Sequence, residues 1–305
     1  MRDAFVESLL EEAKKDQNII LITGDLGFGV LEKFQRELPL QFINSGVNEQ
    51  TMIGMAAGIA STGKRVFVYS IGNFPTLRCL EQIRNDVCLM NNPVVIVSVG
   101  AGYAYGPQGY THHALEDIAV MRSLPNLEVV VPADPIETKL ITKYLVESTS
   151  PSYLRLGKSN EKQISNDNLQ VFSGKFNEVI SGNSGTILFV GSVGTVAIKA
   201  AERLKKLNIS VSVASVPFIS NLDSVYLNMA ARKGPIISLE EHSIRGGFGS
   251  ALLEFLNSNR ISANIGLVTS NQHNLSQIGD QDFLRISNGI SVEEIITKFK
   301  AFLEV

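Results

Sequence analysis

The sequence has little of several features that mark specialised classes of protein. Its two cysteines, Cys79 and Cys88, lie in one helix-like stretch, which excludes a disulfide framework and favours a reducing cytoplasm. Lys and Arg number 27 against 30 Asp and Glu, so no basic field attracts nucleic acid or an anionic membrane surface. No run of about eighteen apolar residues could span a bilayer, and residues 1–15 lack the apolar core of a signal peptide. We therefore expect a soluble, cytoplasmic protein that binds neither nucleic acid nor membranes.

Common ligand-binding motifs are also absent. Residues 24–29, GDLGFG, follow an apolar run but do not match the GxGxxG fingerprint, and neither GxxxxGK[ST] nor GxSxG occurs. The sequence thus gives no support for a nucleotide fingerprint or a hydrolase nucleophile elbow. The composition, with 44% hydrophobic and 19% charged residues over 305 positions, predicts a folded chain with a sizeable core.

Apolar, β-branched segments alternate with helix-like segments through the first half of the chain. The predicted strands are Asn18–Thr23, Arg65–Ser70, Pro93–Gly100, Leu127–Val131 and Ser152–Leu156. The predicted helices between them are Val47–Ser61, Thr76–Met90, Leu115–Leu124 and Pro135–Val146. Strands that alternate with helices predict a mostly parallel sheet with helices on both faces.

A change of composition divides the chain. From Gly157 to Gly185 polar residues and glycine dominate, which indicates a connection with an edge strand around Leu169–Phe172. The strand and helix pattern then restarts at Thr186. We therefore predict two α/β domains, the first over residues 1–160 and a smaller one over 185–305, joined by a linker over 161–184.

The first candidate site lies where the sequence NSGVNEQ leads into TMIGMAAG. Asn48 is expected to cap a helix whose first turn holds Glu49, and this arrangement could be purely structural. Gly54, Ala57 and Gly58 remove bulk from the same helix, although each glycine costs it about 1 kcal/mol. A helix tolerates this where a backbone or ligand comes close, so we expect Glu49 at a packed interface that suits it to proton chemistry.

Further candidates follow predicted strands, where α/β proteins place ligand loops. Phe74 could stack on a flat heterocycle or simply pack in the core. Residues 100–113, GAGYAYGPQGYTHH, include His112 and His113, and histidine moves protons near neutral pH. No other ligand-type residue stands nearby at metal spacing, so we predict no metal site in this chain. The residues EEH at 240–242 could form a site, but we favour a strand end that leads through a glycine turn into a helix.

Together these segments resemble the transketolase-like thiamin diphosphate enzymes. Residues 46–70, 73–87 and 106–137 are similar to their pyrimidine-binding domain, and EEHSIRGGFGSAL at 240–252 is similar to the transketolase C-terminal domain. Full-length members begin with a diphosphate-binding domain that carries a GDG motif, and the sequence contains no GDG. The resemblance thus implies one subunit of a split transketolase. An N-terminal-half partner would supply the diphosphate and Mg²⁺ site, and self-association through the glycine-rich helix would give a heterotetramer.

The resemblance also implies roles for individual residues. Glu49 matches the glutamate that hydrogen-bonds N1' of the aminopyrimidine and favours the imino tautomer, whose 4'-nitrogen deprotonates C2 of the thiazolium. Phe74 matches, within one or two positions, the aromatic residue that stacks on the pyrimidine. Asp25 and Leu26 match the loop that approaches the cofactor, and His112 matches the substrate-facing histidine of the family.

Two departures from the family bear on the substrate. Gln108 stands where the family has an aspartate that contacts a sugar hydroxyl, and Lys158 stands where it has a phosphate-binding arginine. With His113 also near the substrate, and Glu49 and His112 as the catalytic pair, we expect ketol transfer between sugars or sugar phosphates. A modified or nucleotide-linked sugar is plausible. The alternatives are a 2-oxoacid dehydrogenase β subunit, half of a 1-deoxyxylulose-5-phosphate synthase, or a non-catalytic interaction subunit.

Overall fold

Two separate sheets organise the chain, which a computed structural model describes over residues 1–272 and 275–303. The first sheet has six strands, all parallel, in the order β2-β1-β3-β4-β6-β5. Its strands are β1 (Ile19–Thr23), β2 (Phe42–Asn44), β3 (Arg65–Ile71), β4 (Val94–Val99), β5 (Glu128–Val130) and β6 (Ser152–Leu156). Strands β1, β4 and β6 are buried along their whole length, as expected for parallel strands covered on both faces. The predicted parallel sheet is therefore confirmed.

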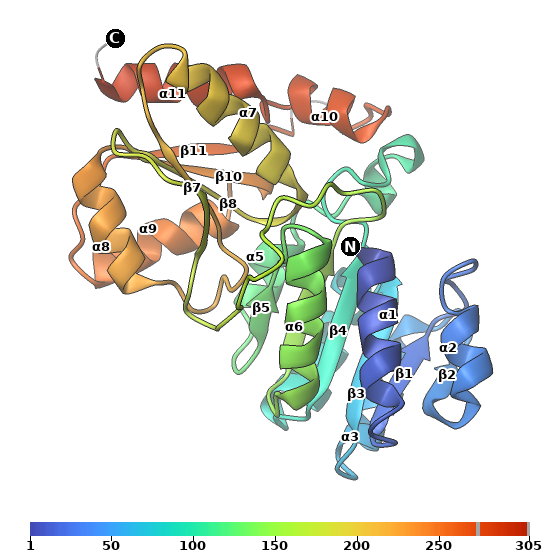
Figure 1. The fold of residues 1–305 in the computed structure, drawn as a ribbon. Coiled ribbons are helices and arrows are strands. Elements are labelled where there is room, and N and C mark those ends of the chain that lie inside the picture. Colours follow the sequence, from blue (N-terminus) through green and yellow to red (C-terminus); the bar gives the residue numbers. More distant parts are fainter. Residues whose placement is uncertain (273–274, 304–305) are drawn as a thin grey trace.

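Helices cover both faces of this sheet (Figure 1). Ile19 and Leu21 face one apolar cluster and Ile20 and Ile22 face another, because successive strand residues point to opposite sides. The first cluster packs under α1 (Arg2–Ala13) and α6 (Pro135–Glu147), which lie side by side. The second packs under α3 (Glu49–Ala60), the π-helical turn Ile83–Leu89 after α4 (Leu80–Gln82), and α5 (Asp117–Arg122), while α2 (Glu32–Glu37) precedes β2.

The second sheet has five strands in the order β11-β10-β8-β9-β7. Strands β8 (Thr186–Phe189), β9 (Ser212–Ser215), β10 (Ile236–Ser243) and β11 (Ile265–Ser270) are parallel, and β7 (Asn177–Ile180) is antiparallel. Helices α7 (Gly194–Lys205) and α11 (Val292–Leu303) cover one face, and α8 (Ser224–Lys233) and α9 (Phe248–Ser258) cover the other (Figure 1). The short helix α10 (Gln281–Ser287) lies toward the first domain.

One sequence prediction about the connection was wrong. The structure has no strand at Leu169–Phe172, and the edge strand is β7 at Asn177–Ile180, inside the segment predicted as a linker. Val171 instead packs against the core of the first domain, and Phe172 is 56% exposed. Of the apolar residues that indicated a strand, Val171 thus packs on the first domain while Phe172 faces solvent.

Hydrogen bonds and buried charges join the two domains. The amide of Val131 donates to the carbonyl of Pro217 at 2.8 Å, and the amide of Ile219 donates to the carbonyl of Val129 at 3.0 Å. The outer edge of β5 therefore continues into the second domain.

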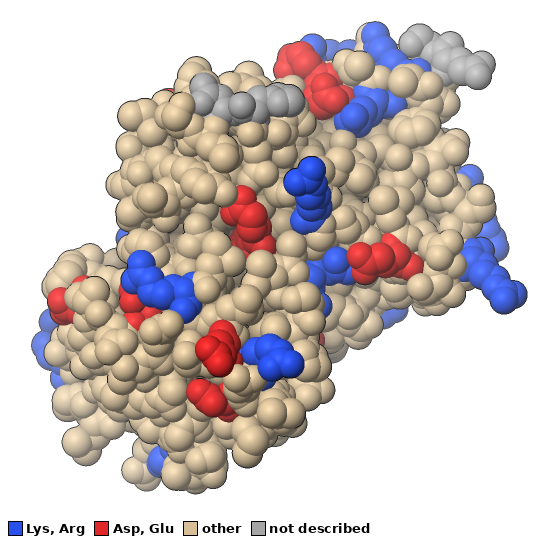
Figure 2. Space-filling model, turned by 180° about the vertical axis from the view of Figure 1, so that it is seen from behind, with Lys and Arg blue, Asp and Glu red and all other residues tan. Residues whose placement is uncertain are grey.

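On the face shown in Figure 2, charged side chains of both signs are interspersed, with broad areas between them that carry none. No helix among the described residues is long and apolar enough to cross a membrane.

Candidate active site

Four loops meet at the carboxyl edge of the first sheet, the edge at which parallel strands present ligand-binding segments. They follow β1, β2, β3 and β4; three of them hold Asp25, Phe74 and His112, and the loop after β2 leads into α3 at Glu49. Because β2, β1, β3 and β4 are hydrogen-bonded neighbours in that order, these residues lie close together although they are far apart in the sequence.

The loops after β1 and β2 hold each other through two side chains. Asn44 Nδ2 donates to Asp25 Oδ1 at 3.0 Å, and the amide of Asp25 donates to Asn44 Oδ1 at 3.0 Å. Asp25 has a φ of 56°, in the left-handed region that a non-glycine residue adopts at a cost. Leu26 follows it, partly buried. A Cβ on Gly24 would lie 3.8 Å from Cγ of Glu49, so this loop borders the glutamate.

Glu49 is the first residue of α3, and its side chain is 4% exposed. Asn48 Oδ1 accepts a hydrogen bond from the amide of Thr51 at 3.3 Å, which confirms the predicted cap. The helix dipole at this end favours a negative charge. Glu49 Oε2 lies 2.7 Å from Nη1 of Arg78, whose side chain is 47% exposed. A buried carboxylate is thus paired with an arginine that reaches solvent.

The turn after β3 joins Phe74 to the histidine loop. Asn73 Nδ2 donates to the carbonyl of His113 at 2.7 Å, and the rings of Phe74 and His112 lie edge to face with centroids 5.3 Å apart. Cζ of Arg78 lies 4.5 Å from the centroid of Phe74. Sequence reasoning did not single out Arg78, which lies in the short 3₁₀ turn Leu77–Cys79; the signal that could have found it is a positive charge close in sequence to the aromatic candidate Phe74.

The second domain supports the loop of residues 100–113. Glu241 Oε1 accepts a hydrogen bond from the amide of Tyr103 at 2.7 Å, and Glu241 Oε2 is paired with Arg285 at 2.5 Å. Burial raises the pKa of Tyr103 to about 12, so its hydroxyl stays protonated beside Ser270. Sequence reasoning missed this support, which depends on a buried glutamate from the far side of the domain boundary.

The remaining predicted substrate residues lie at different depths, His113 and Gln108 in this loop and Lys158 after β6. His113 is 2% exposed, with Nε2 3.2 Å from the carbonyl of Gly106, and burial lowers its pKa. It supports the loop from inside, and its predicted place near the substrate stays a prediction. Lys158 Nζ lies 4.8 Å from the ring centroid of Tyr105, and Gln108 is exposed.

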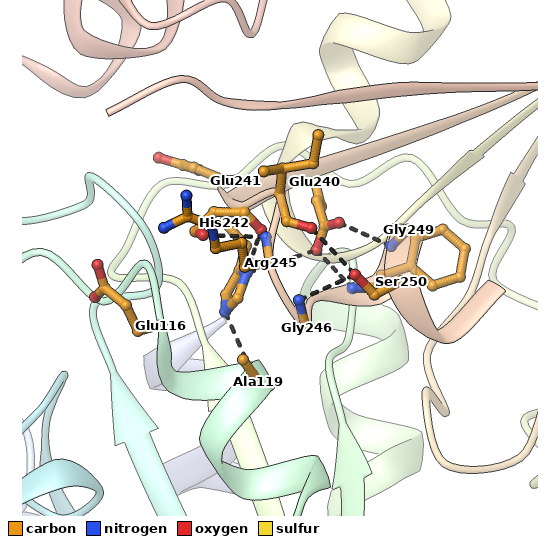
Figure 3. Close-up of polar contacts among 12 residues, drawn as sticks. Glu116, Ala119, Glu240, Glu241, His242, Arg245, Gly246, Gly249 and Ser250 are labelled. Atoms are coloured by element: carbon orange, nitrogen blue, oxygen red, sulfur yellow. Dashed lines mark hydrogen bonds and ion pairs between the residues drawn. The ribbon is translucent and has the colours of Figure 1, made fainter. Parts of the chain in front are cut away.

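Figure 3 shows Glu240 and His242 hydrogen-bonded within the fold, and Glu241 makes the contacts to Tyr103 and Arg285 given above. Glu240 Oε1 accepts a hydrogen bond from the amide of Gly249 at 2.8 Å and so caps α9; burial raises its pKa, against the effect of His242 and the helix amides. His242 is buried, with Nδ1 2.8 Å from the carbonyl oxygen of the next residue and Nε2 3.4 Å from the amide of Ala119. The prediction of a strand end that leads into a helix is confirmed.

The cluster around Glu49 suits one end of a flat nitrogen heterocycle. A buried carboxylate oxygen can accept a hydrogen bond from a ring nitrogen that carries a proton, and the ring of Phe74 offers an aromatic surface nearby. Within residues 1–272 and 275–303, no group of three or more His, Cys, Asp and Glu side chains is arranged to hold a metal ion.

Comparisons with known proteins agree with the two-domain fold. The family model of the transketolase pyrimidine-binding domain matches residues 1–163, and that of the transketolase C-terminal domain matches residues 174–283. An apulose-4-phosphate transketolase subunit of Phocaeicola vulgatus is 37% identical over 267 residues, which cover 87% of this chain and 86% of that protein. 1-Deoxy-D-xylulose-5-phosphate synthase 1 of Geobacter metallireducens is 32% identical over 98% of this chain and 48% of that protein.

A solved structure has the same fold over almost the whole chain. It is described as a split gene transketolase, inactive beta4 tetramer, and is 30% identical. The two superpose with a TM-score of 0.89 over 99% of this chain and 97% of that one. The chain belongs to the transketolase family, of which it contains the pyrimidine-binding domain and the C-terminal domain.

Proposed function

We propose that the chain is a subunit of a split, thiamin diphosphate-dependent transketolase that transfers a two-carbon ketol unit between sugars or sugar phosphates. The observation that carries this proposal is the buried carboxylate of Glu49 at the start of α3, beside Phe74 and His112. The similarity to a protein that is itself named as a transketolase subunit, over 86% of that protein's length, supports a chain that works with a second subunit.

Thiamin diphosphate, when bound, would supply the carbanion chemistry that transketolases use. Glu49 would hold N1' of the aminopyrimidine through a hydrogen bond, and its fixed place in the first turn of α3 orients that bond. Phe74 would present its ring face to the pyrimidine. Asp25 and Leu26 border the same space, so they would line the cofactor from the side of β1.

His112 would act on the substrate. Its Nδ1 lies 3.0 Å from the hydroxyl of Thr111, which orients the ring so that Nε2 is the nitrogen offered to a substrate oxygen. The ring lies between Phe74 and Tyr105, with centroids 5.3 Å and 6.3 Å away. Lys158, above the ring of Tyr105, would bind an anionic group of the substrate, and Gln108 would bind a hydroxyl.

The diphosphate and Mg²⁺ would be held by an N-terminal-half partner subunit, with the active site at the boundary between the two chains. Exposed surface on α3 and just before it supports self-association, because a Cβ on Gly54 or Gly58 would meet no atom within 4 Å and Val47, which precedes the helix, is 75% exposed. A heterotetramer would then contain two copies of each chain.

Glu49→Gln tests the proposal in the complex co-expressed with the partner subunit. Glutamine keeps the shape of the side chain but cannot hold a proton for N1', so we expect ketol transfer to fall by at least about a hundredfold. Turnover is measured with a panel of ketose donors and aldose acceptors, and cofactor binding by calorimetry. The matched control is Glu81→Gln, an exposed carboxylate on the nearby helix α4. Near wild-type turnover of Glu49→Gln would contradict the proposal.

A second candidate activity is that of a 1-deoxyxylulose-5-phosphate synthase half, favoured by the 32% identity to the Geobacter enzyme. It differs in its donor, because such enzymes decarboxylate pyruvate. Release of CO₂ from pyruvate by the co-expressed complex, without ketol transfer from sugars, would favour this activity. Pyruvate consumption linked to an acyl acceptor would favour a 2-oxoacid dehydrogenase β subunit, and cofactor turnover that does not require this chain would favour an interaction subunit.

A further inference from the structure

We propose that Arg78 competes with the aminopyrimidine ring of the cofactor for the same two partners, and that its guanidinium leaves Glu49 when the ring binds. The inference rests on the proposed function, because it takes Glu49 and Phe74 as the residues that receive the ring. It adds a residue that controls how tightly the ring is held.

The contacts of Arg78 coincide with those expected of the ring. Its Nη1 donates to Glu49 Oε2 at 2.7 Å, and its Cζ lies 4.5 Å from the centroid of Phe74. A guanidinium is planar, donates through N–H groups and stacks on aromatic faces. An aminopyrimidine is also planar, bonds to the carboxylate through a nitrogen and stacks on the aromatic ring. Two flat groups cannot hold one position, so one of them must move.

The surroundings show which partner is able to move. The Glu49 side chain is 4% exposed at the start of a twelve-residue helix, whereas the Arg78 side chain is 47% exposed. The backbone of Arg78 is held separately, because its carbonyl accepts a hydrogen bond from Gln50 Nε2 at 3.2 Å. The guanidinium can therefore turn into solvent while the chain around it keeps its place, provided that the ring takes over the hydrogen bond to the buried carboxylate of Glu49.

The exchange of partners has a chemical consequence. Arginine remains protonated at any physiological pH, so it cannot share a proton with Glu49 as a ring nitrogen would. While Arg78 holds the carboxylate, a buried charge is satisfied but proton exchange is blocked. Arg78 thus neutralises the buried charge of Glu49 before the cofactor binds. The free energy of this ion pair must be given up on binding, which lowers the apparent affinity for the cofactor.

The test compares Arg78→Met with wild type in two preparations. In the complex co-expressed with the partner and stripped of cofactor, calorimetry with thiamin diphosphate and Mg²⁺ should show about three- to tenfold tighter binding by the variant. In the chain alone, the variant should unfold about 2–4 °C lower, because Glu49 loses its partner. In a Glu49→Gln background the same substitution should leave the unfolding temperature unchanged. Arg84→Met is the control, since Arg84 is exposed and donates to its neighbour Asn85 at 2.9 Å.

The outcomes separate the inference from the proposed function. Unchanged or weaker cofactor binding by Arg78→Met, in a complex whose wild type binds normally, would overturn the inference alone. Weaker binding would show that Arg78 stays in place and supports the ring. If the wild-type complex binds no cofactor, the proposed function fails and the inference fails with it.

Discussion

Replacing Glu137 with glutamine should flatten the dependence of stability on pH. Glu137 lies in the first turn of α6 and is fully buried at the domain junction. Its carboxylate accepts hydrogen bonds from the amide of Ala133 at 2.8 Å, from Asn177 Nδ2 at 2.8 Å and from Ser215 Oγ at 3.0 Å. Burial raises the pKa of Glu137 to about 7, although these hydrogen bonds act in the opposite direction.

The size and sign of the effect follow from this pKa. A rise from 4.5 to about 7 corresponds to roughly 3 kcal/mol, at about 1.4 kcal/mol per pH unit. The folded-state pKa of Glu137 lies above its unfolded value. The protonated carboxyl therefore contributes fully to the free energy of unfolding below the unfolded pKa of 4.5, and this contribution is lost as the pH rises through about 7. Glutamine has no such proton to lose. Relative to wild type, Glu137→Gln should therefore gain about 2–3 kcal/mol between about pH 5 and pH 8.

Urea unfolding at intervals across this pH range measures the difference. The amide of glutamine can keep the hydrogen bonds from Ala133 and Ser215 through its oxygen, while Asn177 turns its own oxygen toward the new NH₂ group. Glu147→Gln is the control, because Glu147 lies on the same helix with its side chain exposed. A stability difference between wild type and Glu137→Gln that stays constant from about pH 5 to pH 8 would refute the reasoning.

Two other substitutions test the junction. The guanidinium of Arg155 lies 2.6 Å from the buried carboxylate of Asp117 and lowers the pKa of that carboxyl, against the effect of burial. Arg155→Met leaves this charge unpaired, so urea unfolding should show a loss of about 3–5 kcal/mol in the free energy of unfolding. Adding Asp117→Asn should recover part of the loss. Gly102→Ala places a Cβ 2.4 Å from Cγ of Glu241 at a φ of 60°, and a loss of about 1–3 kcal/mol is expected by thermal unfolding. Retention of full stability by either variant would contradict the contact assigned to it.

The sequence predicts those strands and helices whose buried residues form a regular apolar pattern. The run PVVIVSVG predicts a central parallel strand because both of its faces are apolar, and β4 occupies it as Val94–Val99. Strand β2, with three residues, is too short to show any period. Helices α2, α8 and α10 were also not predicted. The edge strand lies at Asn177–Ile180 rather than at 169–172. It pairs with β9, and its Asn177 hydrogen-bonds Glu137; a linear pattern reveals neither partner.

In the candidate site, the sequence likewise predicts the local features but not the contacts between distant residues. The cap by Asn48 and the place of Glu49 in the first helical turn are local properties, and the sequence predicts both. The pairing of Glu49 with Arg78 is not local, because 29 residues separate them. His112 and His113 are adjacent, yet one borders Phe74 and the other is buried against Tyr103, so only the path of the loop assigns them different surroundings.

The ends of the first sheet also limit how this protein can associate with copies of itself. One end is β2, which has three residues, and the other is β5, whose outer backbone groups are hydrogen-bonded to residues 217–219. A long row of free backbone amides and carbonyls invites another chain to add a strand and is a common start of aggregation. Neither end of this sheet offers such a row. Association at these ends must therefore use side chains, whose shape and charge select the partner.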